Sequence, residues 1–167
     1  MSVSLNDPLL DGDVHASGPA TDGPEQAALY DDRRVPMTRL AYLLTGSVAV
    51  AEELVHDAFE QVVRRWDSID NPGGYLRVAV VNGARSWGRR RREIPLPPLE
   101  NHPAIDADAI AVRAALADLR HDEREALVLR YYAGLTDSQI AYAVDRPIGT
   151  IKSQIHRGLE RMRKELA

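Results

Sequence analysis

Hydrophobic residues recur at helical spacing over most of this 167-residue chain, and the clearest case lies near its end. Five apolar positions are spaced there by four, four, three and four residues: Ile151, Ile155, Leu159, Met162 and Leu166. This spacing predicts a helix with one buried stripe. The opposite face carries small polar and charged side chains: Lys152, Ser153, His156, Arg157 and Glu160. Such a helix can anchor by one face and reach into the DNA major groove with the other.

A shorter helix is predicted just before this one. Thr136 is a good N-cap, and Gln139 three residues later completes a capping box. Ile140 and Val144 then fall on one face of the helix. Pro147 and Gly149 interrupt the pattern as turn residues do, so residues 135–157 form a candidate helix-turn-helix. The alternative is a plain helical hairpin with a solvated charged face.

The first half of the chain predicts three further helices, over about 28–44, 48–66 and 73–92. Pro36 lies inside the first of these and must either start a helix or kink one. The loop before the third helix ends in Asn71, a suitable cap, followed by a proline at the first helical position. The second half adds helices over about 107–119 and from a cap at Asp122 to Tyr132. The fold class is therefore all-α.

A change in composition divides the chain. Residues 93–106 hold four prolines and only acidic charged side chains apart from one histidine, which predicts an extended tether. Residues 28–92 and 107–167 then form two small helical domains joined by this Pro-rich acidic linker. Residues 1–27 are rich in Gly, Pro, Asp and Ser, which predicts a disordered acidic tail. The tail is either a solubilising leader or a screen for basic surfaces elsewhere.

The net charge of −4 conceals an uneven distribution. Residues 1–32 hold seven acidic residues and no Lys or Arg, so residues 33–167 carry 18 acidic against 21 basic residues. Within that part, residues 64–92 hold eight arginines and two aspartates. A basic central segment that follows an acidic N-terminal segment in the sequence is compatible with nucleic-acid binding.

Several classes of function are not favoured by the composition. The chain has no cysteine, which argues against disulfides and thiolate metal sites and is typical of a reducing cytoplasm. Its five histidines are scattered without metal-ligand spacing, and we find no phosphate-cradling loop or nucleophile motif. We expect no enzyme activity, no cofactor and no metal. No apolar run is long enough for membrane insertion, and no signal peptide is evident.

Four blocks of sequence, in order, resemble an extracytoplasmic-function sigma factor of bacterial RNA polymerase, of the actinobacterial type. They are residues 40–46 (LAYLLTG), 51–59 (AEELVHDAF), 75–87 (YLRVAVVNGARSW) and 147–153 (PIGTIKS). The resemblance covers about residues 29–166 and implies that the two helical domains are sigma region 2 and sigma region 4. The partners it implies are the β and β′ subunits of core RNA polymerase, promoter DNA and an anti-sigma factor.

The resemblance also implies three sets of site residues. The core polymerase-binding set lies on the acidic face of the second helix: Glu52, Glu53, Leu54 and Asp57. The set that melts and reads the promoter −10 element lies on and before the third helix: Asp70, Asn71, Asn82, Arg85, Arg89 and Arg90. The set that reads the −35 element lies on the last helix: Thr150, Lys152, Ser153, Gln154, His156 and Arg157. For each set, an ordinary solvated helix face is the alternative.

Two departures from the family pattern concern the −35 set. The family often has Arg where Gln154 stands, and commonly an aromatic residue or Leu near His156.

The linker over residues 94–103 resembles a segment that passes the polymerase active site, where its acidity fits mimicry of nascent RNA; a plain tether is the alternative. The rival function is a transcription regulator of another class, with a helix-turn-helix and an N-terminal protein-interaction domain.

Overall fold

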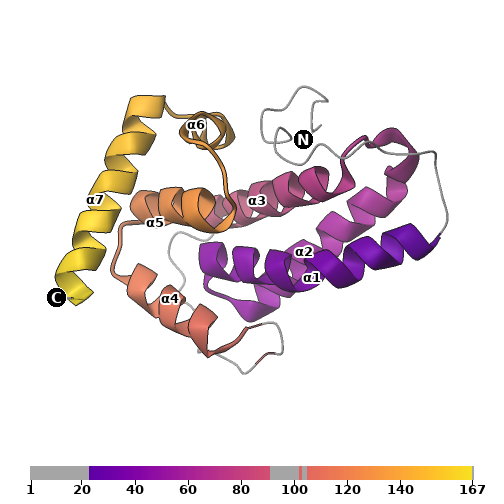
Figure 1. Cartoon of the computed structure of the whole chain (residues 1–167), viewed down its shortest axis with the longest axis horizontal. Helices are drawn as coiled ribbons and strands as arrows, with labels where there is room; N and C mark the ends of the chain where they lie inside the picture. Colours follow the sequence, from indigo (N-terminus) through magenta and orange to yellow (C-terminus); the bar gives the residue numbers. More distant parts are fainter. Residues whose placement is uncertain (1–22, 91–101, 103–104, 167) are drawn as a thin grey trace.

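The computed structural model describes residues 23–90, 102 and 105–166, and these form two packed groups of helices (Figure 1). The first group contains α1 (Gly23–Thr45), α2 (Val48–Arg64), the short 3-10 helix η2 (Trp66–Ser68) and α3 (Pro72–Arg90). The second contains α4 (Ala107–Ala117), α5 (His121–Leu127), the π-helical turn η3 (Val128–Tyr132), α6 (Asp137–Val144) and α7 (Ile148–Leu166). The described residues are almost entirely helical, as the sequence predicts.

The first group is held together by apolar faces that meet between α1, α2 and α3. Leu40 and Tyr42 of α1, Val62 of α2, and Leu76 and Val80 of α3 are all completely buried. Leu76 and Val80 are four residues apart and share one face of α3, whereas α1 is buried all round from Leu40 to Leu43, so the three helices share a core. Burial of these side chains is the main force that stabilises this group.

Local signals set the helix ends of the first group. Gly46 has a positive φ of 73° and ends α1, and the Ser47 side chain accepts a hydrogen bond from the Val50 N–H at 3.4 Å to cap α2. Asn71 Oδ1 accepts from the Gly74 N–H at 2.8 Å, which confirms the predicted cap of α3. Helix α1 runs through Pro36 and does not begin there.

The second group is built around the helix-turn-helix. The Thr136 side chain accepts from the Gln139 N–H at 3.2 Å, and Gln139 Oε1 accepts from the Thr136 N–H at 2.9 Å, as the capping box predicts. Asp145, with φ of 51°, ends α6 in a left-handed conformation. Gly149 is part of α7 and not of the turn. Helix α7 packs closely on α5, because a Cβ at Gly158 would lie only 2.8 Å from Leu127 Cδ1.

The two groups contact each other directly, which the prediction of a simple tether did not include. Asp106, the N-cap of α4, forms an ion pair with Arg39 of α1. The Tyr132 hydroxyl at the end of η3 donates to the Pro36 carbonyl of α1 at 3.4 Å. Helix α5 meets the C-terminal part of α3, where Arg85 donates a hydrogen bond to Glu125. The described residues therefore form one packed arrangement of two helical units.

Two predicted boundaries need correction. Helix α1 begins at Gly23, so the last five residues of the predicted tail 1–27 are helical; residues 1–22 lie outside the described residues. Asp122 does not cap α5, which begins at His121 with Arg120 at the N-cap position. Most of the predicted linker 93–106 also lies outside the described residues, apart from His102 and residues 105–106.

Candidate nucleic-acid and polymerase interfaces

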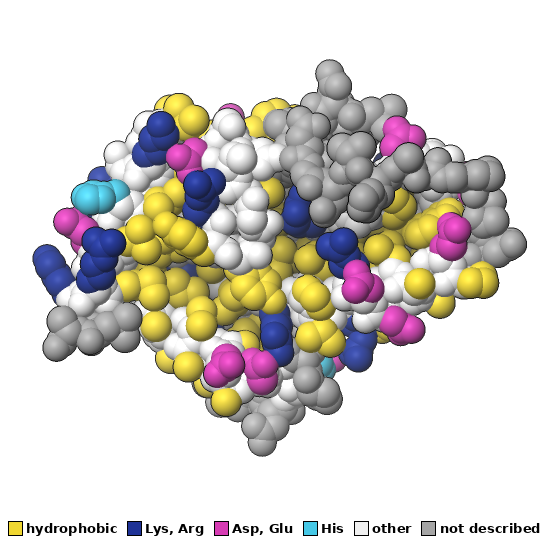
Figure 2. Space-filling view, viewed as in Figure 1, with side chains coloured by type: hydrophobic (Ala, Val, Ile, Leu, Met, Phe, Trp, Pro, Cys, Tyr) yellow, Lys and Arg dark blue, Asp and Glu magenta, His cyan; other side chains and the backbone are white. Residues whose placement is uncertain are grey.

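The outer face of α7 presents the side chains predicted to read DNA. Ile151 is completely buried and anchors the helix, whereas Lys152, Ser153, His156 and Arg157 are exposed. Basic side chains and a histidine gather on the surface over α7 (Figure 2). The helix stands at one end of the molecule (Figure 1), and the side chains of this face are exposed to solvent. Its position and chemistry suit entry into a major groove.

Two members of the predicted −35 set are less accessible. Gln154 is only 4% exposed, so this arrangement does not favour the predicted contact of its side chain with DNA. The reason is its angular position: three residues after Ile151 and one before Ile155, it falls at the inner edge of the helix. Thr150 is half-buried in the first turn of α7.

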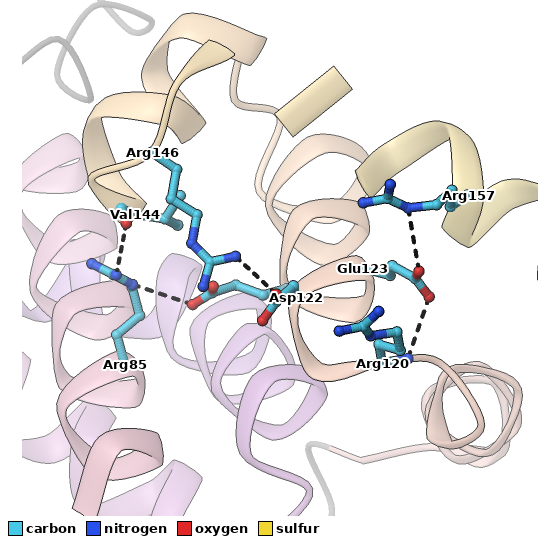
Figure 3. Close-up of polar contacts among 8 residues, drawn as sticks. Arg85, Arg120, Asp122, Glu123, Val144, Arg146 and Arg157 are labelled. Carbon is cyan, nitrogen blue, oxygen red and sulfur yellow. Dashed lines mark hydrogen bonds and ion pairs between the residues drawn. The ribbon is translucent and has the colours of Figure 1, made fainter. Parts of the chain in front are cut away.

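A buried carboxylate holds one of the candidate DNA-reading side chains. Glu123 of α5 is 1% exposed, and its oxygens lie 3.7 Å from Arg157 Nε and 3.4 Å from Arg161 Nε. Glu123 Oε2 also accepts a hydrogen bond from the Arg120 backbone N–H at 3.4 Å (Figure 3). Glu123 is not among the site residues that the sequence predicts. Its position three residues after the helix N-cap was the signal that could have identified it.

The −10 candidates occupy α3 and the loop before it. Asp70, Arg89 and Arg90 are exposed, and Asn82 is half-buried. Asn71 is also half-buried, with its side chain used to cap α3. Exposed arginines at the C-terminal end of α3 can contact phosphates, as single-strand binding requires.

Arg85 occupies a different position from the one its predicted role requires. Its Nε donates to Glu125 of α5 at 3.2 Å, and Nη2 donates to the Val144 carbonyl at 3.2 Å (Figure 3). A further hydrogen bond from Nη1 reaches the Ala143 carbonyl. These carbonyls are the last of α6, where the helix dipole favours a cation. In this arrangement Arg85 therefore joins the two units and does not face DNA, which corrects its predicted placement.

The acidic face of α2 agrees in exposure with the predicted polymerase-binding set. Glu52, Glu53 and Asp57 are exposed. Leu54 is half-buried against α3, where a Cβ at Gly83 would come within 2.9 Å of Leu54 Cδ2. Glu52 Oε1 lies 2.6 Å from His102 Nε2, so one acidic side chain of the face already has a partner from the linker.

Other kinds of site find no support in the part of the chain that the structure describes. No group of three or more His, Cys, Asp or Glu side chains there could hold a metal ion. None of the helices within those ranges is long and apolar enough to cross a bilayer.

The fold and its surfaces define a class: an all-helical protein with a helix-turn-helix beside a second helical unit. Comparison with known proteins identifies the family. The family model for sigma-70, region 4 matches residues 115–164, which include the helix-turn-helix. The chain is 32% identical to an RNA polymerase sigma-E factor of Streptomyces coelicolor over 144 residues, covering 80% of this chain and 81% of that protein.

Two more relatives agree with this assignment. The ECF RNA polymerase sigma factor SigE of Mycolicibacterium smegmatis is 32% identical over 148 residues, 77% of this chain and 56% of that protein. The sigma factor RpoE of Bartonella quintana, solved in complex with the anti-sigma factor NepR, has a TM-score of 0.62 at 26% identity. That match covers 86% of this chain and 94% of the RpoE chain.

The chain belongs to the RNA polymerase sigma factors, in the extracytoplasmic-function subfamily. This confirms the resemblance drawn from the four sequence blocks and replaces the rival interpretation as a regulator of another class. Its relatives are transcription initiation factors and not enzymes.

Proposed function

We propose that this chain binds core RNA polymerase through α2 and directs promoter-specific initiation with two separate DNA surfaces. The α7 face with Lys152, Ser153 and Arg157 reads the −35 element. Helix α3 and the loop before it, with Asp70, Asn82 and Arg89, contact and open the −10 element. The observation that carries the proposal is the exposed basic face of α7 within the matched sigma-70 region 4. The protein acts in the cytoplasm, where the polymerase meets promoter DNA.

We also propose that the β and β′ subunits of the polymerase both contact the chain. The acidic, exposed α2 face supports an interface with β′, because it offers charge complementarity to a basic surface. The Bartonella RpoE structure contains an anti-sigma factor, and its similarity to this chain supports regulation by a protein of that kind.

The free protein is expected to bind duplex promoter DNA weakly and to need core polymerase for opening. Each DNA surface offers few phosphate contacts, and Arg85 is engaged by the second unit in the packed arrangement. A shift assay at physiological salt should give a Kd for the free protein in the range of about 10⁻⁴–10⁻⁶ M, typical of non-specific binding. The same promoter with core polymerase added should form a tight, opened complex.

The matched control is the same DNA fragment with its −10 and −35 elements scrambled. The free protein should bind the two fragments equally, whereas the complex with polymerase should distinguish them. Tight and sequence-specific binding by the free protein would contradict this proposal and revive the interpretation as an independent regulator.

A further inference from the structure

A cavity of about 520 Å³ lies between the two helical units. Its walls come from the end of α1, from α3, α4 and α5, and from the turn after α6. Five arginines line it: Arg85, Arg89, Arg113, Arg124 and Arg146. The volume is that of a small-molecule site, which commonly spans about 300–1,000 Å³.

The cavity carries an excess of positive charge. Among the described residues, two carboxylates line it, and each has an arginine partner: Asp122 lies 2.9 Å from Arg146, and Glu125 lies 3.2 Å from Arg85 (Figure 3). The pKa of Asp122 is lowered, first by its hydrogen bond from Arg146. Within the described ranges, Arg113 and Arg124 have no ion pair.

Arg113 is the most unusual of these side chains. It is 5% exposed, and its Nε is buried without a hydrogen-bond partner among the described residues. Within the same ranges, Arg124 makes a long hydrogen bond, at 3.5 Å, to the Leu116 carbonyl. Burial lowers the pKa of both guanidinium groups, and the charge of Arg113 lowers the pKa of Arg124 further. Arg113 is buried and Arg124 half-buried, and placing two neighbouring cations there without a counter-charge from the described residues is costly; an anion in the cavity would offset that cost.

We propose that this cavity binds a small phosphorylated molecule of the nucleotide class, with its phosphates on Arg113 and Arg124. The planar guanidinium fork donates paired hydrogen bonds to phosphate oxygens. Trp87 and Leu44 line the same cavity and offer an aromatic and an apolar surface for a base. Arg113 is too deeply buried to be reached by a duplex, which favours a small molecule over DNA.

Binding at this place has a consequence for the arrangement of the protein. The cavity has walls from both units, so a bound nucleotide would stabilise the packed arrangement over a separated one. In that arrangement Arg85 remains engaged by Glu125 and the end of α6.

Isothermal titration of the full-length protein with ADP, at physiological salt and without polymerase or DNA, tests this inference. We expect one ADP per chain, bound at least tenfold more tightly than pyrophosphate, because pyrophosphate lacks the base. Arg113→Met and Arg124→Met should each weaken ADP binding about tenfold or more, since each removes a charge-assisted contact. Arg64→Met is the matched control, because Arg64 is exposed on α2, where it pairs with Glu60, and does not line the cavity.

Folding of the variants is checked by thermal unfolding without ligand. Arg113→Met should unfold at the same or a higher temperature than the wild type, because it removes an unpaired buried cation. Arg113→Lys keeps the charge but loses the fork, and should also weaken ADP binding if the geometry matters.

Three results would overturn the inference. The first is no measurable ADP binding at millimolar concentration, or equal affinity for ADP and pyrophosphate. The second is ADP binding unchanged in the Arg113 and Arg124 variants or equally lost in Arg64→Met. The third is tighter binding of a short single-stranded oligonucleotide with the same dependence on Arg113, which would assign these arginines to nucleic acid. None of these results depends on promoter recognition, which is tested separately.

Discussion

Glu53→Lys combined with Asp57→Lys is expected to abolish binding to core RNA polymerase while the protein stays folded. Both side chains are exposed on α2, whereas Val55 and Phe59 on its inner side carry the packing. Reversing two charges at an interface places like charges opposite each other, which costs several kcal/mol. We expect a loss of affinity of about a hundredfold or more, or ~3 kcal/mol. Co-purification with core polymerase and titration by fluorescence anisotropy measure it.

The matched control reverses the same number of charges elsewhere. Asp108 and Asp118 are exposed at the two ends of α4, far from α2 in the sequence. Asp108→Lys with Asp118→Lys should leave polymerase binding nearly unchanged. Circular dichroism melting of both double variants verifies the fold. If the α2 variant still co-purifies with core, the polymerase surface has been assigned to the wrong face.

Substitutions on the two proposed DNA surfaces are expected to have different effects. Arg157→Ala should weaken promoter binding and relax the preference at one or two −35 positions, because base-edge contacts carry roughly 1–3 kcal/mol of discrimination each. Asn82→Ala should spare −35 binding and slow strand opening, because α3 is proposed to meet the melted strand. A panel of −35 mutants and permanganate footprinting of the −10 thymines separate the two effects.

Arg161→Ala provides the control for the −35 surface. Arg157 and Arg161 both pair with buried Glu123, so loss of either removes one ion pair of the same carboxylate and should lower thermal stability by a similar amount. Only Arg157 belongs to the proposed reading set. If both variants relax the same −35 preference, the effect comes from stability and not from base contact. If the Asn82→Ala variant opens promoter DNA at the normal rate, α3 does not have the proposed role in strand opening.

Features set by short stretches of sequence were predictable. The Thr136 capping box, the Asn71 cap and the buried side of α7 at Ile151 all depend on residues within one or two turns of each other. Helix periodicity and capping chemistry determine such features, and both can be read directly from residue order.

Features set by distant residues were not predictable in this way. Arg85 bonds to groups 40 to 59 residues away, and Asp122, expected to be a helix cap, pairs with Arg146. Each side chain could have had a purely local role. The packing of one unit on the other determines the partners of Arg85, and the packing of the turn after α6 against α5, within the second unit, determines the partner of Asp122. The burial of Gln154 was not predicted for a different reason. This residue lies at the edge of a helix face, where a small rotation of the helix determines whether its side chain is buried.

The most direct measurement of the sigma role is run-off transcription on a genomic library with core RNA polymerase, with and without this protein. We expect new transcripts only when the protein is present, starting downstream of sites that share one −35 and one −10 sequence at a fixed spacing. The Glu53→Lys, Asp57→Lys variant should give none of them. Transcripts that do not differ between the two reactions, or new starts with no shared −10 element, would contradict the role of this protein in promoter recognition.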